Sequence, residues 1–192
     1  MDNTTLLCGS QPFWDLDLTW NTNQPSFTRC FRRTAFSLIP NAILWGIAPL
    51  YIYKLRKESK VSNHKLALLS IVKILLAVLL VLISLIDLSF WAISDQMLGI
   101  DIMEAIVRFV TFVALILLIK MEAVYGIRVS KVQFFFWTIL VICHFFNSFC
   151  EVMDHFFRIP DIYDHLMPVV TGLAMLSLVF ASFICHFFVD IR

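Results

Sequence analysis

Residues 66–91 read LALLSIVKILLAVLLVLISLIDLSFW, a long apolar run that contains two charged side chains, Lys73 and Asp87. A helix that crosses the hydrocarbon core of a bilayer needs about 20 mostly apolar residues. The run lacks the alternation of apolar and polar residues that marks a strand of a transmembrane barrel. It therefore predicts a membrane-spanning helix and decides the fold class of the chain.

Four other windows have a similar length and character. They lie at about residues 35–53, 102–119, 132–149 and 165–189. The window at 102–119 is the weakest, but its Glu104 and Arg108 are spaced i, i+4 and can pair on one helix face. The sequence predicts an all-α membrane protein, with an extracellular head at 1–34 and a bundle of five transmembrane helices at 35–192.

The composition excludes several classes of function. Hydrophobic residues make up 60% of the chain and charged residues 15%, whereas a soluble domain carries about 25% charged residues. The formal net charge of +1 offers no basic surface for nucleic acid. The five spans use most of the 192 residues, which leaves no room for a catalytic domain of ordinary size outside the membrane. The lipid bilayer is the first expected partner.

Lysine and arginine gather in two connections, and this sets the expected orientation. The connections after the first and third spans contain Lys54, Arg56, Lys57, Lys60, Lys65, Lys120, Arg128 and Lys131. The other two connections are mostly acidic. Because short basic loops stay in the cytoplasm, we expect the N-terminus outside and the C-terminus inside. Arg29, Arg32 and Arg33 precede the first span and oppose this orientation, but the basic residues on its other flank outnumber them.

The head contains two cysteines, Cys8 and Cys30, on the side expected to be oxidising. Two thiols in a short segment without its own core favour a bridge over two free thiols. The other three cysteines lie in or at the ends of spans and are expected to be small packing residues. Asn3 begins the triplet Asn-Thr-Thr, an acceptor for N-glycosylation on the expected outer side.

Aromatic residues are concentrated between the two cysteines. They are Phe13, Trp14, Trp20 and Phe27. A ligand site is one interpretation of this group. We favour the other, in which the rings pack the head and hold it at the lipid interface, where tryptophan is enriched.

The head and first span also resemble a known family. The residues that carry the resemblance are Cys8, Trp14-Asp15, Thr19-Trp20-Asn21-Thr22 and Pro25-Ser26-Phe27-Thr28-Arg29-Cys30-Phe31, followed by Trp45 and Pro49. They resemble the start of the multidrug-resistance-associated proteins, the long members of the C subfamily of ABC transporters. The start Cys8-Gly9-Ser10 is also similar to the related sulfonylurea-receptor branch. The specific match covers residues 8 to 53, and the later helices agree with the family's extra N-terminal domain only in number and orientation.

The resemblance implies a disulfide between Cys8 and Cys30, and a parent protein that exports organic anions and conjugates with ATP. The chain contains no G-x-x-x-x-G-K-[ST] phosphate loop, so no cofactor, transport or enzymatic activity of its own is expected. The expected function is that of an accessory domain in assembly, trafficking or partner docking, beside an ABC transporter core supplied in cis or as a separate chain. The expected location is the plasma membrane, with an internal membrane as the alternative. The alternative function is that of a stand-alone membrane adaptor that binds another membrane protein. A membrane enzyme has the least support.

Ionisable groups inside the spans are expected to be structural. Asp87 and Arg108 lie at the same depth of neighbouring spans, where an ion pair would satisfy both. Lys73 is expected to extend toward the cytoplasm. His144 and Asn147 are expected to hydrogen-bond to another helix, because the histidines show no metal-binding spacing. We therefore expect no catalytic and no metal site.

The basic residues on the inner side have two interpretations. They can attract anionic lipid and set the topology, which is what such loops do in most bundles. Alternatively they form a docking face for the transporter core, made of Lys54, Arg56, Lys57, Lys60, Arg128 and Lys131. Ala42 and Gly46 in the first span form a small-residue step that allows close helix approach, either inside the bundle or against a core.

The orientation predicts a labelling pattern. Ser62→Cys should resist an impermeant thiol reagent in intact cells, because its basic connection faces the cytoplasm, whereas Gln96→Cys should react. Labelling is measured as a mass shift of the recovered protein. The reverse pattern would overturn the orientation and the oxidising environment of the head.

Overall fold

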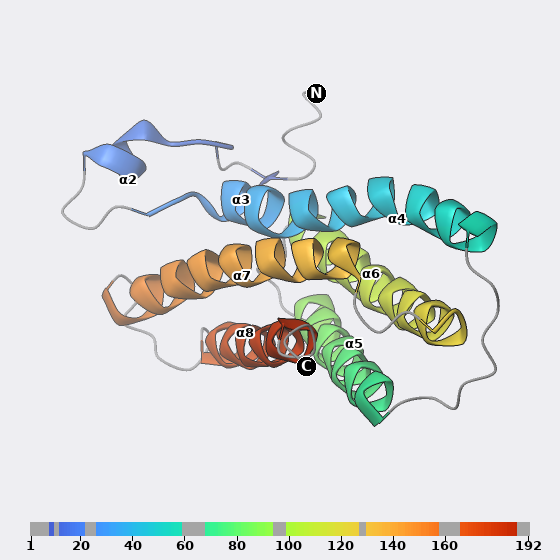
Figure 1. The fold of residues 1–192 in the computed structure, drawn as a ribbon. Coiled ribbons are helices and arrows are strands. Elements are labelled where there is room, and N and C mark those ends of the chain that lie inside the picture. Colours follow the sequence, from blue (N-terminus) through green and yellow to red (C-terminus); the bar gives the residue numbers. More distant parts are fainter. Residues whose placement is uncertain are drawn as a thin grey trace.

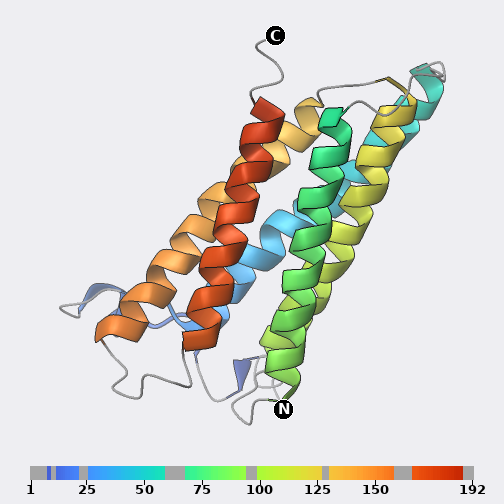
Figure 2. The same cartoon turned by 90° about the horizontal axis from the view of Figure 1, so that it is seen from below.

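A computed structural model describes residues 8–9, 12–21, 26–58, 68–93, 99–126, 130–157 and 166–187. Within these ranges the regular structure is helical and contains no strand. Five helices in the described chain are long and apolar enough to cross a membrane, and Figures 1 and 2 show them side by side as one bundle. The prediction of an all-α bundle of five transmembrane helices is confirmed.

The first span is one continuous rod made of three helical segments. They are α3 (Arg29–Arg32), η1 (Arg33–Leu38), a π-helix, and α4 (Ile39–Glu58). The rod begins at Arg29 because Thr28 caps it, accepting a hydrogen bond from the backbone N–H of Phe31. Residues 29–34, which the sequence places in the head, therefore form the first turns of the span.

The other helices follow the apolar windows closely. They are α5 (Leu68–Ile93), α6 (Gly99–Val124), α7 (Lys131–Phe157) and α8 (Leu166–Phe187), and a short helix of the head, α2 (Leu16–Trp20), precedes the spans. Helices α6 and α7 extend further than an apolar window predicts, because their terminal turns contain polar residues that pair inside the protein, such as Glu122 and Glu151. Charged residues thus lie within the helices instead of ending them.

The bundle is a group of four helices with the first span laid along one side. Helix α5 packs against α6 and α8, and α7 packs against α8, while α4 contacts α6 and α7 (Figure 2). The apolar centre is fully buried and includes Leu80, Phe112, Leu115, Leu140 and Met175. Because lipid tails are as apolar as these side chains, close packing and polar contacts, more than the hydrophobic effect, hold such helices together.

The outer surface is as apolar as the interior. Exposed side chains on the spans include Leu75 of α5, Leu117 of α6, Phe145 of α7 and Phe180 of α8. In water such a surface would drive aggregation, whereas a bilayer solvates it. The multi-pass membrane class therefore follows from the surface as well as from helix length.

Packing in the centre should dominate stability. We predict that Phe112→Ala lowers the free energy of unfolding by about 3 kcal/mol, because it opens a cavity where α6 is completely enclosed. Phe145→Ala is the matched control, since that ring faces lipid and loses little on truncation. Unfolding in mixed micelles measures both. Equal effects of the two variants would contradict the assignment of inner and outer faces.

Candidate functional site

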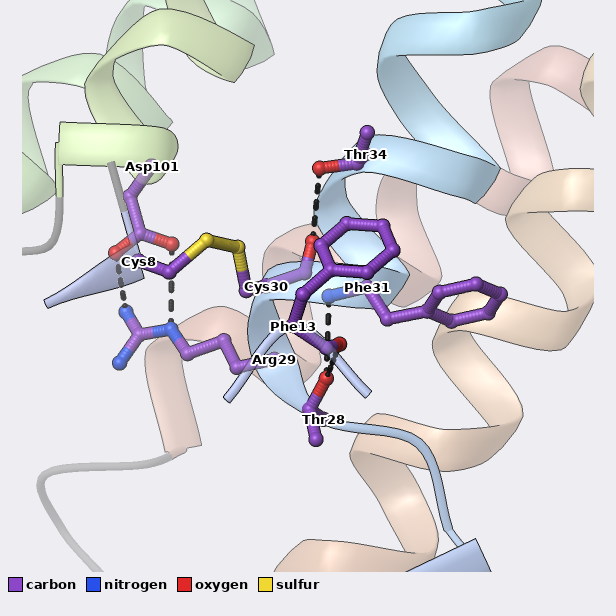
Figure 3. The surroundings of a disulfide bond; sticks show 8 residues. All are labelled: Cys8, Phe13, Thr28, Arg29, Cys30, Phe31, Thr34 and Asp101. Atoms are coloured by element: carbon purple, nitrogen blue, oxygen red, sulfur yellow. Dashed lines mark hydrogen bonds and ion pairs between the residues drawn. A yellow bond between two sulfur atoms is a disulfide. The ribbon is translucent and has the colours of Figure 1, made fainter. Parts of the chain in front are cut away.

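The disulfide links the head to the start of the first span. Cys8 and Cys30 are bridged, with their Cα atoms 5.5 Å apart, and both residues are buried (Figure 3). Cys30 belongs to α3, one residue after the helix begins. Thr28 beside it donates a hydrogen bond to the carbonyl of Phe13. The bridge therefore fixes the head at the point where the chain enters the bundle.

A group of charged residues surrounds this entry point, and we call it the head-side ion cluster. Its members are Arg29, Arg32, Arg33, Asp87, Asp101, Glu104, Arg108, Glu151 and Asp154. They come from α3, η1, α5, α6 and α7. The cluster contains four arginines and five carboxylates, so it carries no excess of positive charge.

Arg29 and Arg33 connect the first span to α6. Arg29 pairs with Asp101 at 2.8 Å between Nη2 and Oδ2 (Figure 3), and Arg33 pairs with Glu104 at 2.9 Å between Nη1 and Oε2. The spacing i, i+4 places the two guanidinium groups on one face of the rod. The Arg29 guanidinium also lies over the ring of Trp91 of α5, 4.4 Å from its centroid. These contacts anchor the start of the first span on α5 and α6.

Arg32 points to the other side of the rod and reaches α7. Its Nη2 lies 3.0 Å from Oδ2 of Asp154, and the hydroxyl of Ser26 lies 3.2 Å from Oδ1 of the same carboxylate. Arg33 contributes a second contact to α7 through Glu151, at 3.5 Å. The first span is thus held between α6 and α7 by charge pairs on both sides.

The structure brings Asp87 and Arg108 together. The guanidinium of Arg108 donates to the Asp87 carboxylate, and it lies 3.4 Å from Glu104, one turn away on α6. The indole N–H of Trp91 donates to Asp87 at 3.1 Å. All of these groups are buried, so each charge depends on its neighbours for solvation.

Sequence reasoning missed the role of the three arginines before the first span. It counted Arg29, Arg32 and Arg33 as basic residues on the wrong side of the membrane. In the structure each one faces a carboxylate of α6 or α7, so none presents a free positive charge to the bilayer surface. A signal existed in the sequence, because the connections on the same side are acidic and supply Asp101 and Asp154.

Helix α8 approaches the cluster through a glycine. Ser148 of α7 donates a hydrogen bond to the carbonyl of Gly172 at 3.3 Å. A Cβ atom at Gly172 would lie 2.6 Å from a carboxylate oxygen of Glu151, closer than real contacts allow. Gly172 therefore leaves the space in which Glu151 reaches Arg33.

A second polar layer lies at the opposite end of the bundle. It includes the buried side chains of Lys73 and Glu122 and that of Tyr51, which hydrogen-bonds to Glu122. Gln133 of α7 contacts the ring of His186 of α8, with 2.5 Å between Oε1 and Nε2. Lys73 is buried among the helices, which differs from the expectation that it extends toward the cytoplasm.

The two polar layers are separated by an apolar one. On α5 the order is Lys73, Leu80, Asp87, and on α6 it is Glu122, Leu115, Arg108, with steps of seven residues in both. Seven residues rise about 10 Å along a helix. The layers are therefore about 20 Å apart. Ser84, Thr111 and His144 extend the head-side layer inward, and the buried side chains at mid-depth, such as Leu80, Leu115 and Leu140, are apolar.

The chemistry of this arrangement is structural. Asn147 donates to Glu151 of its own helix at 3.1 Å, and not to another helix as expected from the sequence. In the described part of the chain, no group of three or more His, Cys, Asp or Glu side chains could hold a metal ion. The carboxylates of the head-side ion cluster face guanidinium groups, and not an open cavity.

The proposed docking residues divide into two groups. Lys54, Arg56, Lys57 and Lys131 are exposed at the end of the bundle away from the head. Lys60 and Arg128, together with the glycosylation acceptor Asn3, lie outside the described residues. The exposed residues share one end of α4 and α7.

The arrangement of head, disulfide and helices matches a known domain. The family described as ABC transporter TMD0 domain matches residues 5–167, which include the head and the first four spans. The chain belongs to this TMD0 family. The resemblance to the C subfamily of ABC transporters also extends to individual proteins. This TMD0 chain is similar to the rat ATP-binding cassette sub-family C member 3, with 34% identity over 146 residues.

The human member 3 is 32% identical over 190 residues. The matches cover 71% of this TMD0 chain for the rat protein and 88% for the human one. They cover only 10% and 12% of those relatives. The chain thus spans about a tenth of the length of the proteins it resembles, and what their remaining nine-tenths do cannot be transferred to it directly.

Removing either member of the ion pair between Asp87 and Arg108 should destabilise the fold, because each buried charge is solvated by the other. We predict that Asp87→Asn and Arg108→Gln each lower the free energy of unfolding by about 3 kcal/mol, because each leaves a buried charge without its partner. The double variant should cost clearly less than the sum. Arg56→Gln, at an exposed arginine, is the control and should have little effect. Additive single effects in a double-mutant cycle would show that the two groups do not depend on each other.

Proposed function

We propose that this TMD0 domain is an N-terminal accessory domain of an ABC exporter of organic anions and conjugates. It acts in assembly, trafficking or partner docking and does not move the substrate itself. The observation that carries this proposal is the filled interior. A continuous path for a polar substrate needs polar groups at successive depths, whereas here buried apolar side chains such as Leu80, Leu115 and Leu140 fill the middle of the bundle between the two polar layers.

Membership of the TMD0 family supports the role of an accessory membrane domain of an ABC transporter. A TMD0 domain is a membrane domain of ABC transporters, and this chain contains no phosphate loop of its own. ATP would therefore be bound by nucleotide-binding domains outside this domain. We propose the plasma membrane as its location, with the head outside.

The head-side ion cluster, which has no excess of positive charge, supports this orientation. The positive-inside rule counts basic side chains that must be kept on the cytoplasmic side. Arg29, Arg32 and Arg33 pair with carboxylates, so they add little net positive charge on the head side. The basic residues at the other end of the bundle then favour a cytoplasmic location for that end, and the three paired arginines no longer oppose it.

Two surfaces are available for a transporter core. One is the cytoplasmic basic face, of which Lys57 and Lys131 are exposed. The other is the outward side of α4, where Ala42 and Gly46 are exposed and a Cβ at Gly46 would meet nothing within 4 Å. The small residues of this step do not pack inside the bundle, which leaves them available for docking.

Neutralising the basic face should weaken docking. We predict that Arg128→Gln with Lys131→Gln reduces co-purification of the chain with a co-expressed exporter core several-fold, because a cationic contact is lost. Arg128→Lys with Lys131→Arg preserves the charge and should retain association. Cysteine labelling at position 62 checks that the topology is intact, since the first basic connection is unchanged. Undiminished association of the neutralised variant would contradict a basic docking face.

The accessory role itself has a separate test. The purified chain in liposomes should neither hydrolyse ATP nor accumulate a conjugated anion. Co-expression with a core that lacks this domain should increase the amount of core at the cell surface. Turnover by the chain alone, or a core that is unaffected by it, would overturn the proposal.

A further inference from the structure

The short helix α2 lies at the side of the bundle and not above its centre. In Figures 1 and 2 it sits beside the C-terminal end of α7, away from α5 and α8. The backbone N–H of Ser26 donates to the carbonyl of Leu18 in α2 at 3.2 Å. The same residue contacts Asp154 of α7 through its hydroxyl. Two successive hydrogen bonds therefore tie α2 to α7.

These contacts also fix the depth of α2. On α7 the first acidic residues after the apolar window at 132–149 are Glu151 and Asp154, so Asp154 lies just beyond the end of that window. Ser26 touches that residue, and α2 touches Ser26. Helix α2 thus lies at the level where the hydrocarbon core ends and the phospholipid head groups begin.

The three sides of α2 have different characters. Thr19 is buried against the head, and its hydroxyl donates to the carbonyl of Asp15. Asp17 and Asn21, one turn apart, hydrogen-bond to each other at 2.8 Å. Leu16 and Trp20 are also one turn apart and are 64% and 73% exposed. An apolar side therefore lies between a polar side and a buried one.

The exposed side chains of α2 are distinct from the aromatic packing of the head. Trp14 meets the ring of Phe31 edge to face, with centroids 4.7 Å apart. The same group of rings continues through Phe36 to Phe146 of α7, which faces lipid. The apolar side of α2 thus lies beside a surface that reaches the lipid-facing side of the bundle. Trp20 has no ring partner among the described residues and stands out from this group.

We propose that α2 is an interfacial anchor, with Leu16 and Trp20 inserted into the phospholipid head-group layer of the bilayer that the bundle spans. An amphipathic helix at this depth buries its apolar side at the boundary between head groups and acyl chains. Tryptophan suits this position because its ring is apolar while its N–H can bond to head groups or water. Asp17 and Asn21 remain on the aqueous side. The proposal is independent of any transporter core and of the orientation of the chain.

The anchor can be tested by fluorine NMR on the full chain in phosphatidylcholine nanodiscs. The chain is labelled with 5-fluorotryptophan, and Trp20→Phe identifies the Trp20 signal. A lipid with a nitroxide on its head group should broaden this signal several-fold more than a water-soluble gadolinium chelate does. Trp137, which is 1% exposed, is the internal control and should respond weakly to both.

A second variant separates insertion from simple proximity. Leu16→Asp places a charge on the apolar side. The chelate should then broaden the Trp20 signal more, and the nitroxide lipid less, than in the unmodified chain. Asp17→Asn on the polar side should leave both responses unchanged. A Trp20 signal that responds mainly to the chelate in the unmodified chain would overturn the proposal. So would an unchanged response in the Leu16→Asp variant whose other four fluorotryptophan signals show a folded protein.

Discussion

The constraint behind this structure is that a charge inside a bilayer needs an opposite charge beside it. The three arginines at the start of the first span cannot enter an apolar layer alone. Their pairing with Asp101, Glu104 and Asp154 determines which helices flank the first span. The disulfide, the capped start of α3 and the position of the head all lie within a few residues of these pairs. Solvation of charge, more than apolar packing, therefore organises the head-side end.

Much of the fold could be predicted from the sequence because the bilayer imposes a simple length rule. The run at 66–91 and its four counterparts identified the spans, and equal depth pointed to the contact between Asp87 and Arg108. The same rule failed at the helix ends, where it treats every charge as a boundary. It could not show that Lys73 would remain buried, because that burial depends on the helices packed around α5. The identity of the neighbouring helices is absent from any single apolar window.

The two polar layers give the bundle a different set of buried polar groups at each end. The apolar layer between them is closely packed and separates the head-side ion cluster from the polar groups around Glu122. Buried side chains of α5, α6 and α7 fill the space between the two layers. This packed interior agrees with the accessory role proposed above.

The arginines before the first span have a consequence for biosynthesis. The ribosome makes Arg29 well before Asp101, and the two are 72 residues apart in the chain. Until α6 and α7 have been made, these guanidinium groups lack the carboxylates with which they pair in the folded bundle, so water must solvate them. The first span therefore emerges with its early turns at the water boundary and settles only when the later helices arrive. The head therefore reaches its final position when the bundle is complete, and not when the first helix is inserted.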